Sequence, residues 1–163
     1  MRAFWMVVLS ACVSFAMIPL FFSTPASASK AGIGSGYLFA YSKTKKYTIT
    51  LEKIVVPIRL SQLSIDPPSG TRFIGVEFKV RNTGTKALDF SIDLYTYAVD
   101  SSRETLQFSP ATSTNCRAFD NGAGDAAPVP GSYVVGCVIF AVPKKQKLTK
   151  IEFGSGTPVV WSV

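Results

Sequence analysis

One stretch of alternating residues, Thr71 to Gly84, limits the folds open to this chain more than any other feature. Apolar side chains occupy every second position from Ile74 to Val80, with small or charged residues between them. Because successive side chains of a strand point to opposite faces, this pattern predicts a strand with one buried face. It ends at Asn82-Thr83-Gly84, where Asn and Gly tolerate positive φ and predict a turn. Such a strand needs paired edges and a second layer, so we predict a β-sandwich.

The rest of the chain carries further strands separated by turn signals. Residues 47–58 are β-branched and aromatic, with Pro57 indicating an edge position or a bulge. Residues 132–142 are apolar on both faces, as expected in the middle of a sandwich. Shorter strands are expected at 88–92, 93–99, 104–109, 147–153 and 159–163. Seven or eight antiparallel strands at this spacing predict an all-β, immunoglobulin-like β-sandwich.

The first 28 residues have the order of a secretory signal peptide. A basic start at Arg2 is followed by an apolar run from Phe4 to Phe22 and then by the small-x-small sequence Ala26-Ser27-Ala28. We therefore place the signal peptide at 1–28, with cleavage between Ala28 and Ser29. Export predicts an extracellular or cell-envelope location.

Two alternatives compete with cleavage. The apolar run would span about 28 Å at roughly 1.5 Å per residue, so it is long enough to be retained as a membrane anchor. In that case the signal segment would be the membrane contact. Leu9-Ser10-Ala11-Cys12 is similar to a lipoprotein box, but the residues after Cys12 stay apolar where a lipoprotein would turn polar. Cleavage without lipidation is the favoured interpretation.

Removal of 28 residues from 163 leaves a mature chain of 135, enough for one domain with its own core. Residues 29–44 begin with a Gly- and Ser-rich stretch and are expected to form a flexible lead. Residues 45–163 are expected to form the sandwich domain.

The charge balance suggests one kind of partner. The net charge is +7, and it falls to +6 when Arg2 leaves with the signal. An exported basic protein meets anionic lipids, wall polymers and glycans, so nucleic acid is not an expected partner. Excess charge can also serve only solubility, and lysines at strand edges discourage aggregation. The candidate contacts to an anionic surface are Lys43, Lys45, Lys46, Lys144, Lys145, Lys147 and Lys150.

Several chemistries are absent or weak in this sequence. It contains no His, so no Ser-His-Asp or Cys-His site can form within the chain. Residues 120–125, from Asp120 to Asp125, carry two Asp and one Asn, too few for calcium, which takes about six to eight oxygen ligands. A polar turn is favoured there, and a weak metal site stays open. We predict no enzyme and no cofactor.

Three aromatic residues, Tyr95, Tyr97 and Trp161, could form a ligand platform. In a sandwich such residues more often belong to the core or to cross-strand pairs. The sequence therefore assigns them no binding role.

Four segments within residues 45–163 resemble a known bacterial family. They are Phe73-Ile-Gly-Val-Glu-Phe-Lys-Val-Arg-Asn-Thr-Gly84, Pro130-Gly131, Gly136-Cys-Val-Ile-Phe-Ala-Val-Pro143, and Ile151-Glu-Phe153 with Val160-Trp-Ser-Val163. The chain resembles the telokin-like, immunoprotective extracellular domain family, typified by a secreted mycobacterial antigen. The resemblance implies an immunoglobulin-like sandwich in a secreted or envelope-tethered protein with no established enzymatic activity.

The functional expectation is therefore a non-enzymatic binding or structural domain whose partner is an unknown protein or envelope component. The alternative is a basic surface that binds an anionic envelope polymer or lipid.

Cys116 and Cys137 are the only cysteines after the signal segment, and an oxidising compartment favours a disulfide between them. The bridge would enclose a loop of 21 residues and stabilise the fold by about 3 kcal/mol on the chain-entropy account. Cys137 alternates with Val138 and Phe140, so the bridge should lie on the outside of the sheet. A free reactive thiol is the alternative, although no His is present to activate it.

Overall fold

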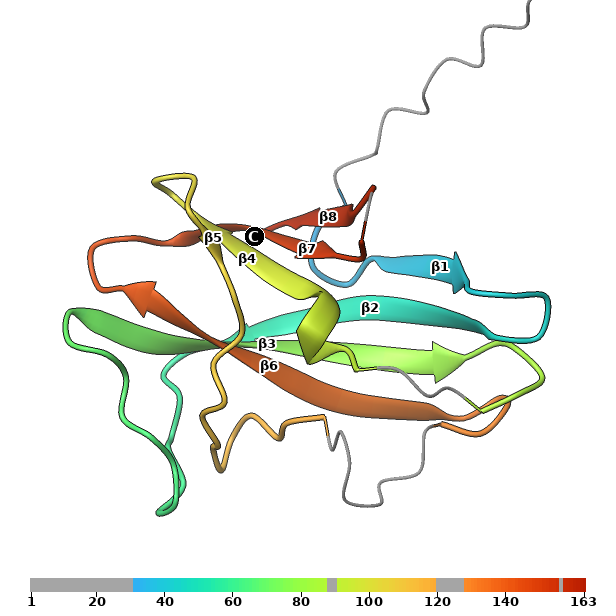
Figure 1. Cartoon of the computed structure of the whole chain (residues 1–163), viewed down its shortest axis with the longest axis horizontal. Helices are drawn as coiled ribbons and strands as arrows, with labels where there is room; N and C mark the ends of the chain where they lie inside the picture. Colours follow the sequence, from blue (N-terminus) through green and yellow to red (C-terminus); the bar gives the residue numbers. More distant parts are fainter. Residues whose placement is uncertain (1–30, 88–90, 120–127, 156) are drawn as a thin grey trace, which may run out of the picture.

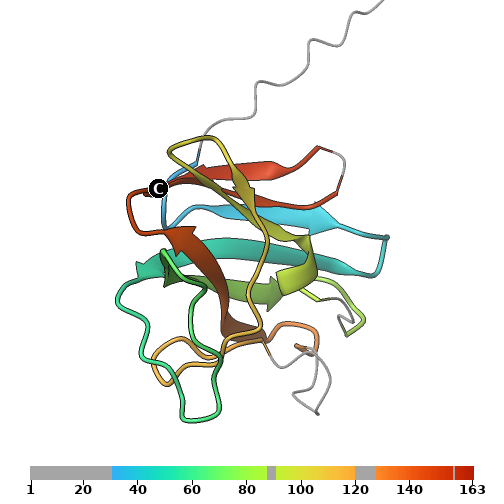
Figure 2. The same ribbon diagram turned by 60° about the vertical axis from the view of Figure 1, so that its left-hand side comes forward.

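The structure is a computed structural model that describes residues 31–87, 91–119, 128–155 and 157–163. In these residues eight strands form two antiparallel four-stranded sheets that stack as two layers (Figures 1 and 2). The predicted all-β sandwich is confirmed. The first sheet has the order β1 (Gly36–Ala40), β2 (Lys46–Val55), β3 (Thr71–Asn82) and β6 (Tyr133–Pro143). The second has the order β5 (Thr105–Leu106), β4 (Thr96–Asp100), β7 (Leu148–Phe153) and β8 (Val159–Ser162).

β3 lies inside the first sheet, paired with β2 on one side and β6 on the other. Val76 and Phe78 are fully buried between the sheets, whereas Glu77 and Lys79 on the opposite face are partly exposed. The predicted alternation is confirmed. Phe78 meets the ring of Trp161 from β8, with ring centroids 5.8 Å apart, so the core joins the two sheets directly.

The turn after β3 falls where the sequence predicts it, but for a different reason. Neither Asn82 nor Gly84 has a positive φ. Instead the buried Asn82 amide donates to the carbonyl oxygens of Lys86 at 2.8 Å and Pro128 at 2.7 Å and accepts from the Gly84 N–H at 2.9 Å. A Cβ at Gly84 would collide with the Thr44 backbone and lie 2.6 Å from the Lys46 nitrogen, so glycine is required by close approach.

A second, smaller apolar cluster lies on the outer face of the first sheet. It contains the bridged pair Cys116 and Cys137, whose Cα atoms are 5.3 Å apart, packed with Phe73 and Ile139. Cys137 therefore faces away from Val138 and Phe140, as its alternation predicts. The bridge holds the segment before residue 120 against the outside of the sheet.

Three strand predictions need correction. Residues 29–44 were expected to be a flexible lead, but β1 forms within them and pairs with β2. β2 ends at Val55, before Pro57; its first half lies between β1 and β3, whereas its last residues pair with β3 alone, and its register with β3 shifts between Leu51 and Lys53. The strand expected at 93–99 begins instead as a short 3-10 turn, η1 (Asp93–Tyr95), before β4. Within this turn the Asp93 carboxylate accepts the Leu94 N–H at 3.0 Å.

Several predictions lie outside the described residues: the signal segment with its cleavage between Ala28 and Ser29, Cys12, residues 88–90 of one expected strand, and Asp120 to Asp125. Within the described residues, no helix has the length and apolar character needed to cross a membrane.

Candidate functional site

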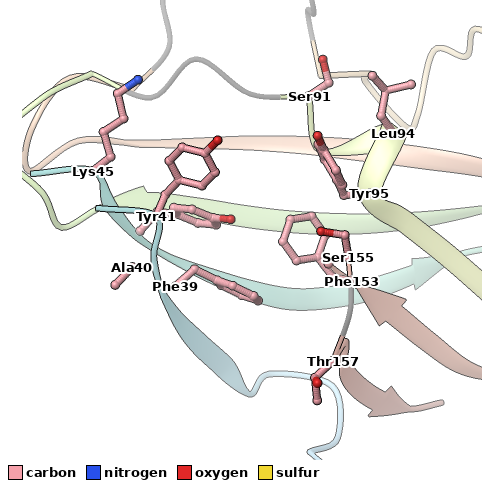
Figure 3. A pocket seen from close by; sticks show the side chains of 12 residues that line it. Phe39, Ala40, Tyr41, Lys45, Ser91, Leu94, Tyr95, Phe153, Ser155 and Thr157 are labelled. Atoms are coloured by element: carbon pink, nitrogen blue, oxygen red, sulfur yellow. The ribbon is translucent and has the colours of Figure 1, made fainter. Parts of the chain in front are cut away.

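A pocket of about 750 Å³ lies between the two sheets near the end of the sandwich that carries the β1–β2 turn (Figure 3). This volume falls in the range of about 300–1,000 Å³ that is usual for small-molecule sites. The pocket draws on four regions of the chain: β1 and β2 with their turn, η1, the end of β7, and the β7–β8 turn. Its lining residues are Phe39, Ala40, Tyr41, Lys45, Tyr47, Ser91, Leu94, Tyr95, Phe153, Gly154, Ser155 and Thr157.

Three aromatic rings form the inner wall of the pocket. Phe39 and Tyr47 are register partners in β1 and β2, and their rings stack at 5.1 Å with planes 10° apart. Phe153 from the second sheet meets Phe39 edge to face, also at 5.1 Å. Offset stacking and edge-to-face packing are the favourable aromatic geometries, so these rings fix one another across the two sheets. The inner wall is therefore a preformed apolar surface.

The rim of the pocket is apolar and exposed. Tyr41 is 84% exposed, Leu94 57% and Tyr95 42%. Figure 3 shows Tyr41 on one side of the hollow and Leu94 with Tyr95 on the other. Large apolar side chains that gather around a concavity, in contrast to ones scattered singly, are a mark of a binding surface.

The polar side chains of the pocket are hydroxyls, which both donate and accept hydrogen bonds, and one ammonium group, which only donates. Lys45 carries the only formal charge among the twelve lining residues, and the other polar side chains are hydroxyls. Burial, with a smaller effect from Tyr95, raises the pKa of Tyr47 to about 12, so its hydroxyl keeps its proton at neutral pH. The lining thus offers ring faces, hydroxyls and one ammonium group, which can bind a ligand by stacking and by hydrogen bonds.

The predicted lysine contacts do not form one surface. Lys43 and Lys45 lie in the β1–β2 turn, with Lys46 opening β2, whereas Lys144 and Lys145 lie in the β6–β7 turn. These two turns are at opposite ends of the sandwich (Figure 1). Lys147 lies just before β7, and Lys150 is an exposed residue within it. Of these seven lysines, Lys45 alone lines the pocket.

The three aromatic residues noted in the sequence have different roles. Tyr95 lines the pocket. Trp161 is fully buried in the core, where its indole N–H donates to the Ser35 carbonyl oxygen at 2.8 Å. Tyr97 lies on β4 and is not part of the lining.

Sequence reasoning missed Phe39, Tyr41 and Tyr47 as site residues. A signal was present, since aromatic rings alternate at positions 37, 39 and 41. The Gly-rich start of the same segment concealed that alternation.

Fold and site together define a small all-β sandwich with a ligand-sized aromatic pocket near one end. No family model and no curated protein matches the sequence. Three solved structures share the fold, beginning with MPT63, a secreted protein from Mycobacterium tuberculosis, at a TM-score of 0.58 and 11% identity. That match covers 85% of this chain and all of MPT63.

The other two structures are the yjhA protein from Bacillus subtilis and an uncharacterized β-sandwich protein from Clostridium difficile. yjhA has a TM-score of 0.52 at 14% identity, covering 82% of this chain and 98% of the other. The clostridial protein has a TM-score of 0.51 at 15% identity, covering 86% and 99%. At these identities the likeness concerns the fold alone.

Proposed function

We propose that this chain is an exported, non-enzymatic binding domain of the telokin-like type and that its ligand binds in the aromatic pocket. The observation that carries the proposal is the exposed rim of Tyr41, Leu94 and Tyr95 around a preformed aromatic wall. The predicted export signal at 1–28 and the likeness to a secreted mycobacterial protein support the extracellular or envelope location.

The pocket favours binding over a purely structural role. Single exposed aromatics are normal on a protein surface, but the rim rings gather around one concavity, which favours a binding role. Here the inner rings are packed and the rim rings are left in solvent, with space between them for a ligand. A ligand would cover the rim and gain the free energy of transferring these rings from water.

The alternative function, a basic surface for an anionic polymer or lipid, has less support. Polyanion binding gains most from cations gathered on one face. The separation of the two lysine clusters to opposite ends of the sandwich opposes a single contact of this kind.

The proposal is tested with an aromatic fragment mixture added to isotopically labelled protein purified after export from a bacterial host. We expect amide shifts that concentrate at the β1–β2 turn, η1 and the β7–β8 turn. Tyr41→Ala combined with Tyr95→Ala should abolish them. Tyr133→Ala is the matched control, since Tyr133 is 60% exposed on β6 and is not part of the lining. Shifts located elsewhere, or insensitive to the double substitution, would overturn the proposal.

A further inference from the structure

We propose that the ligand of the pocket is an extended polypeptide segment, which adds as a further strand to the open edge of β1 and places an aromatic side chain beside Phe39. This inference rests on the proposed function and adds the class of the partner and its mode of binding. It depends on the backbone of β1 and on aromatic packing, and it requires no charged group of the lining.

The edge of β1 that faces away from β2 is open. No strand among the described residues pairs with this side of β1 (Figure 1). β1 also contains no charged residue and no Pro, which are common means of protecting a sheet edge against pairing with another chain. Leu38, at the centre of the strand, is 67% exposed. β1 therefore has the features of an edge that can accept another strand.

The other three edges of the two sheets are short or partly covered. β5 is only two residues long. The outer edge of β6 is bridged by Phe108 at Phe140, and that of β8 is bridged by Ala31 at Trp161. Short edges and covering segments are further means of preventing pairing with another chain. Within the part of the chain that the structure describes, β1 is thus the sheet edge that lacks such protection.

Two hydrogen bonds at the ends of the β1–β2 pair show which backbone groups of β2 face β1. The Gly34 N–H donates to the Leu51 carbonyl at 2.7 Å, and the Tyr41 N–H donates to the Lys45 carbonyl at 3.0 Å. The backbone groups of successive residues in a strand point to alternate sides. The odd-numbered residues of β2 between these two bonds therefore direct their N–H and carbonyl groups at β1.

The register of the pair then assigns the backbone groups of β1. Tyr37 and Phe39 are the register partners of odd-numbered residues of β2, so their N–H and carbonyl groups are directed at β2. Those of Gly36, Leu38 and Ala40 are consequently directed at the open edge. A peptide that runs antiparallel to β1 carries donors and acceptors at the matching spacing, and such main-chain bonds supply affinity in strand addition.

The pocket supplies the specificity. A peptide residue opposite Phe39 directs its side chain to the same face of the sheet as Phe39, with the two Cβ atoms about 4.5–5.5 Å apart. Phe39 lines the pocket, and its ring meets Phe153 edge to face at 5.1 Å. An aromatic side chain at this position would extend that packing in a stacked or edge-to-face geometry. The alternate side chains of the peptide would lie on the outer face, next to Leu38.

A second copy of this chain fits the site less well than a peptide. Its own β1 would direct Tyr37 and Phe39 to the inner face, but both rings are already packed within their own sandwich. Tyr37 meets Trp161 edge to face at 5.1 Å, and Phe39 stacks on Tyr47 at 5.1 Å. A second copy would therefore pair at the edge without supplying a side chain to the pocket.

The test uses the acetylated and amidated peptide Thr-Val-Thr-Phe-Thr-Val-Thr, titrated into the isotopically labelled, exported and processed protein. In an extended peptide of this sequence Val and Phe lie on one face and Thr on the other. We expect the amide signals of Leu38 and Ala40 to shift and their hydrogen exchange to slow, because their N–H groups become bonded to the peptide. The exchange of Phe39 should change less, since its N–H is directed at β2. Replacement of the peptide Phe by Ala should weaken binding.

Peptides with a single N-methyl group distinguish strand addition from other contacts without changing the protein. Directly opposite residues share a face, so a Thr of the peptide lies opposite Leu38 and directs its N–H at β1. We expect N-methylation of a central Thr to raise the Kd about tenfold or more, because it removes a hydrogen bond and places a methyl group between the strands. N-methylation of Phe should leave the Kd nearly unchanged, since that N–H points away from β1. Equal effects at the two positions would overturn the inference.

Leu38→Pro is the diagnostic variant of the protein, and Leu38→Ala is its control. Pro removes the N–H at the open edge, and Pro is tolerated in an edge strand whose N–H faces solvent. Leu38→Ala removes the exposed side chain but keeps the N–H. We expect Leu38→Pro to abolish peptide binding while aromatic fragments still bind in the pocket, and Leu38→Ala to retain binding of both. Unchanged melting temperatures show that the variants are folded, and the N-methylated peptides decide the question if Leu38→Pro is not.

The outcomes separate this inference from the proposed function. Peptide binding that survives Leu38→Pro, or the same loss in both variants, would overturn the inference, as would failure of the peptide to bind where the aromatic fragments do. Sedimentation of the protein without peptide tests the second copy, because a dimer that Leu38→Pro dissociates would assign the edge to that copy and overturn the peptide. In each of these cases fragment binding in the pocket leaves the proposed function intact.

Discussion

At the scale of single residues, Asp100 shows how one buried carboxylate fixes a turn. Its Oδ1 accepts the Ser102 N–H at 2.8 Å, the Ser102 hydroxyl at 2.6 Å and the Glu104 N–H at 3.0 Å. The Ser102 hydroxyl, with help from the backbone N–H groups of residues 102–104 and against the effect of burial, holds the pKa of Asp100 below its usual value. The ionised form is therefore the one that the folded chain stabilises.

This direction of the shift predicts an acid dependence. A carboxyl whose folded pKa lies below its unfolded value of about 3.9 contributes stability above that pH, and the contribution is lost as the pH falls through the folded pKa. Asp100→Asn should be less stable than the unmodified protein at pH 7, and the difference should shrink between about pH 4 and pH 2. Urea unfolding of both proteins across this range measures it. A difference in free energy of unfolding that stays constant with pH would mean that the substitution acts through altered packing or hydrogen bonding and not through the charge of Asp100.

Phe78 and Lys79 are neighbours on β3 with opposite environments. Phe78→Ala should cost about 3–5 kcal/mol in free energy of unfolding, because Phe78 is fully buried between the sheets and leaves a cavity. Lys79→Ala should cost about 1 kcal/mol or less, because the Lys79 ammonium lies 4.4 Å from the exposed Tyr133 ring and makes one cation–π contact. Chemical denaturation of both variants gives the comparison. Equal losses would contradict the alternation on which the sandwich depends.

At the scale of elements, β3 also depends on the absence of a side chain at Gly75. This residue lies beneath the disulfide on the outer face, where an added Cβ would come 2.8 Å from Ile58 Cδ1 and 3.0 Å from Cys137 Sγ, and still closer to Cys116 Sγ. Gly75→Ala should therefore cost about 1–3 kcal/mol through overpacking. Gly32→Ala is the control, since nothing lies within 4 Å of an added Cβ there. Similar stabilities of the two variants would show that the apolar cluster around the disulfide can shift to accommodate the added methyl group at little cost.

The disulfide that joins the loop before residue 120 to β6 leads to a further prediction. Cys116 and Cys137 are nearly fully buried as a bonded pair. Thiol titration of the exported protein under denaturing, non-reducing conditions should find no free thiol from either residue. One or two free thiols per chain would contradict the pairing in the exported protein.

The elements differ in how far their sequences determine them. β3 is predictable because its apolar residues from Ile74 to Val80 follow the period of a strand, and β6 because it is an apolar run of strand length that packs on both faces. β1 is not, since Gly32, Gly34 and Gly36 lower the local strand signal, and its pairing with β2 supplies what propensity lacks. The pocket is harder still to predict from the sequence, because its lining residues are as far apart along the chain as Tyr41 and Thr157. Only the folded topology brings such residues together.

At the scale of the whole molecule, the two ends of the sandwich are chemically different. The β1–β2 end combines exposed aromatics with Lys45 around a pocket. The β6–β7 end exposes Lys144 and Lys145 on a turn whose backbone is bound to Gly70, with Lys144 N–H to Gly70 carbonyl at 2.9 Å. Exposed lysines on a turn suit solubility, whereas a lysine beside an apolar concavity suits a ligand. The net charge of the whole molecule does not distinguish these two ends.

The start of the described chain connects the sandwich to the predicted export signal. Ala31 pairs in parallel with Trp161, and its carbonyl accepts the Ser162 N–H at 2.9 Å. The Ser35 carbonyl accepts the buried Trp161 indole N–H. Cleavage between Ala28 and Ser29 would leave both contacts in the mature protein. We therefore predict that the intact mass of the exported protein corresponds to a chain that begins at Ser29, and a mass with lipid on Cys12 or a retained apolar segment would contradict this.

A chain shortened to begin at Gly36 tests the structural consequence of that boundary. It loses the Ala31 pairing and leaves the Trp161 indole N–H without its acceptor in a side chain that is fully buried. An unsatisfied buried donor costs about 1–3 kcal/mol, so this chain should unfold at lower denaturant concentration than one that begins at Ser29. Both start within the segment expected from sequence to be a flexible lead. Equal midpoints would mean that residues 29–35 add nothing to the fold. A lower midpoint for the shorter chain would show that this segment belongs to the folded domain, in which Ala31 pairs with Trp161 of β8.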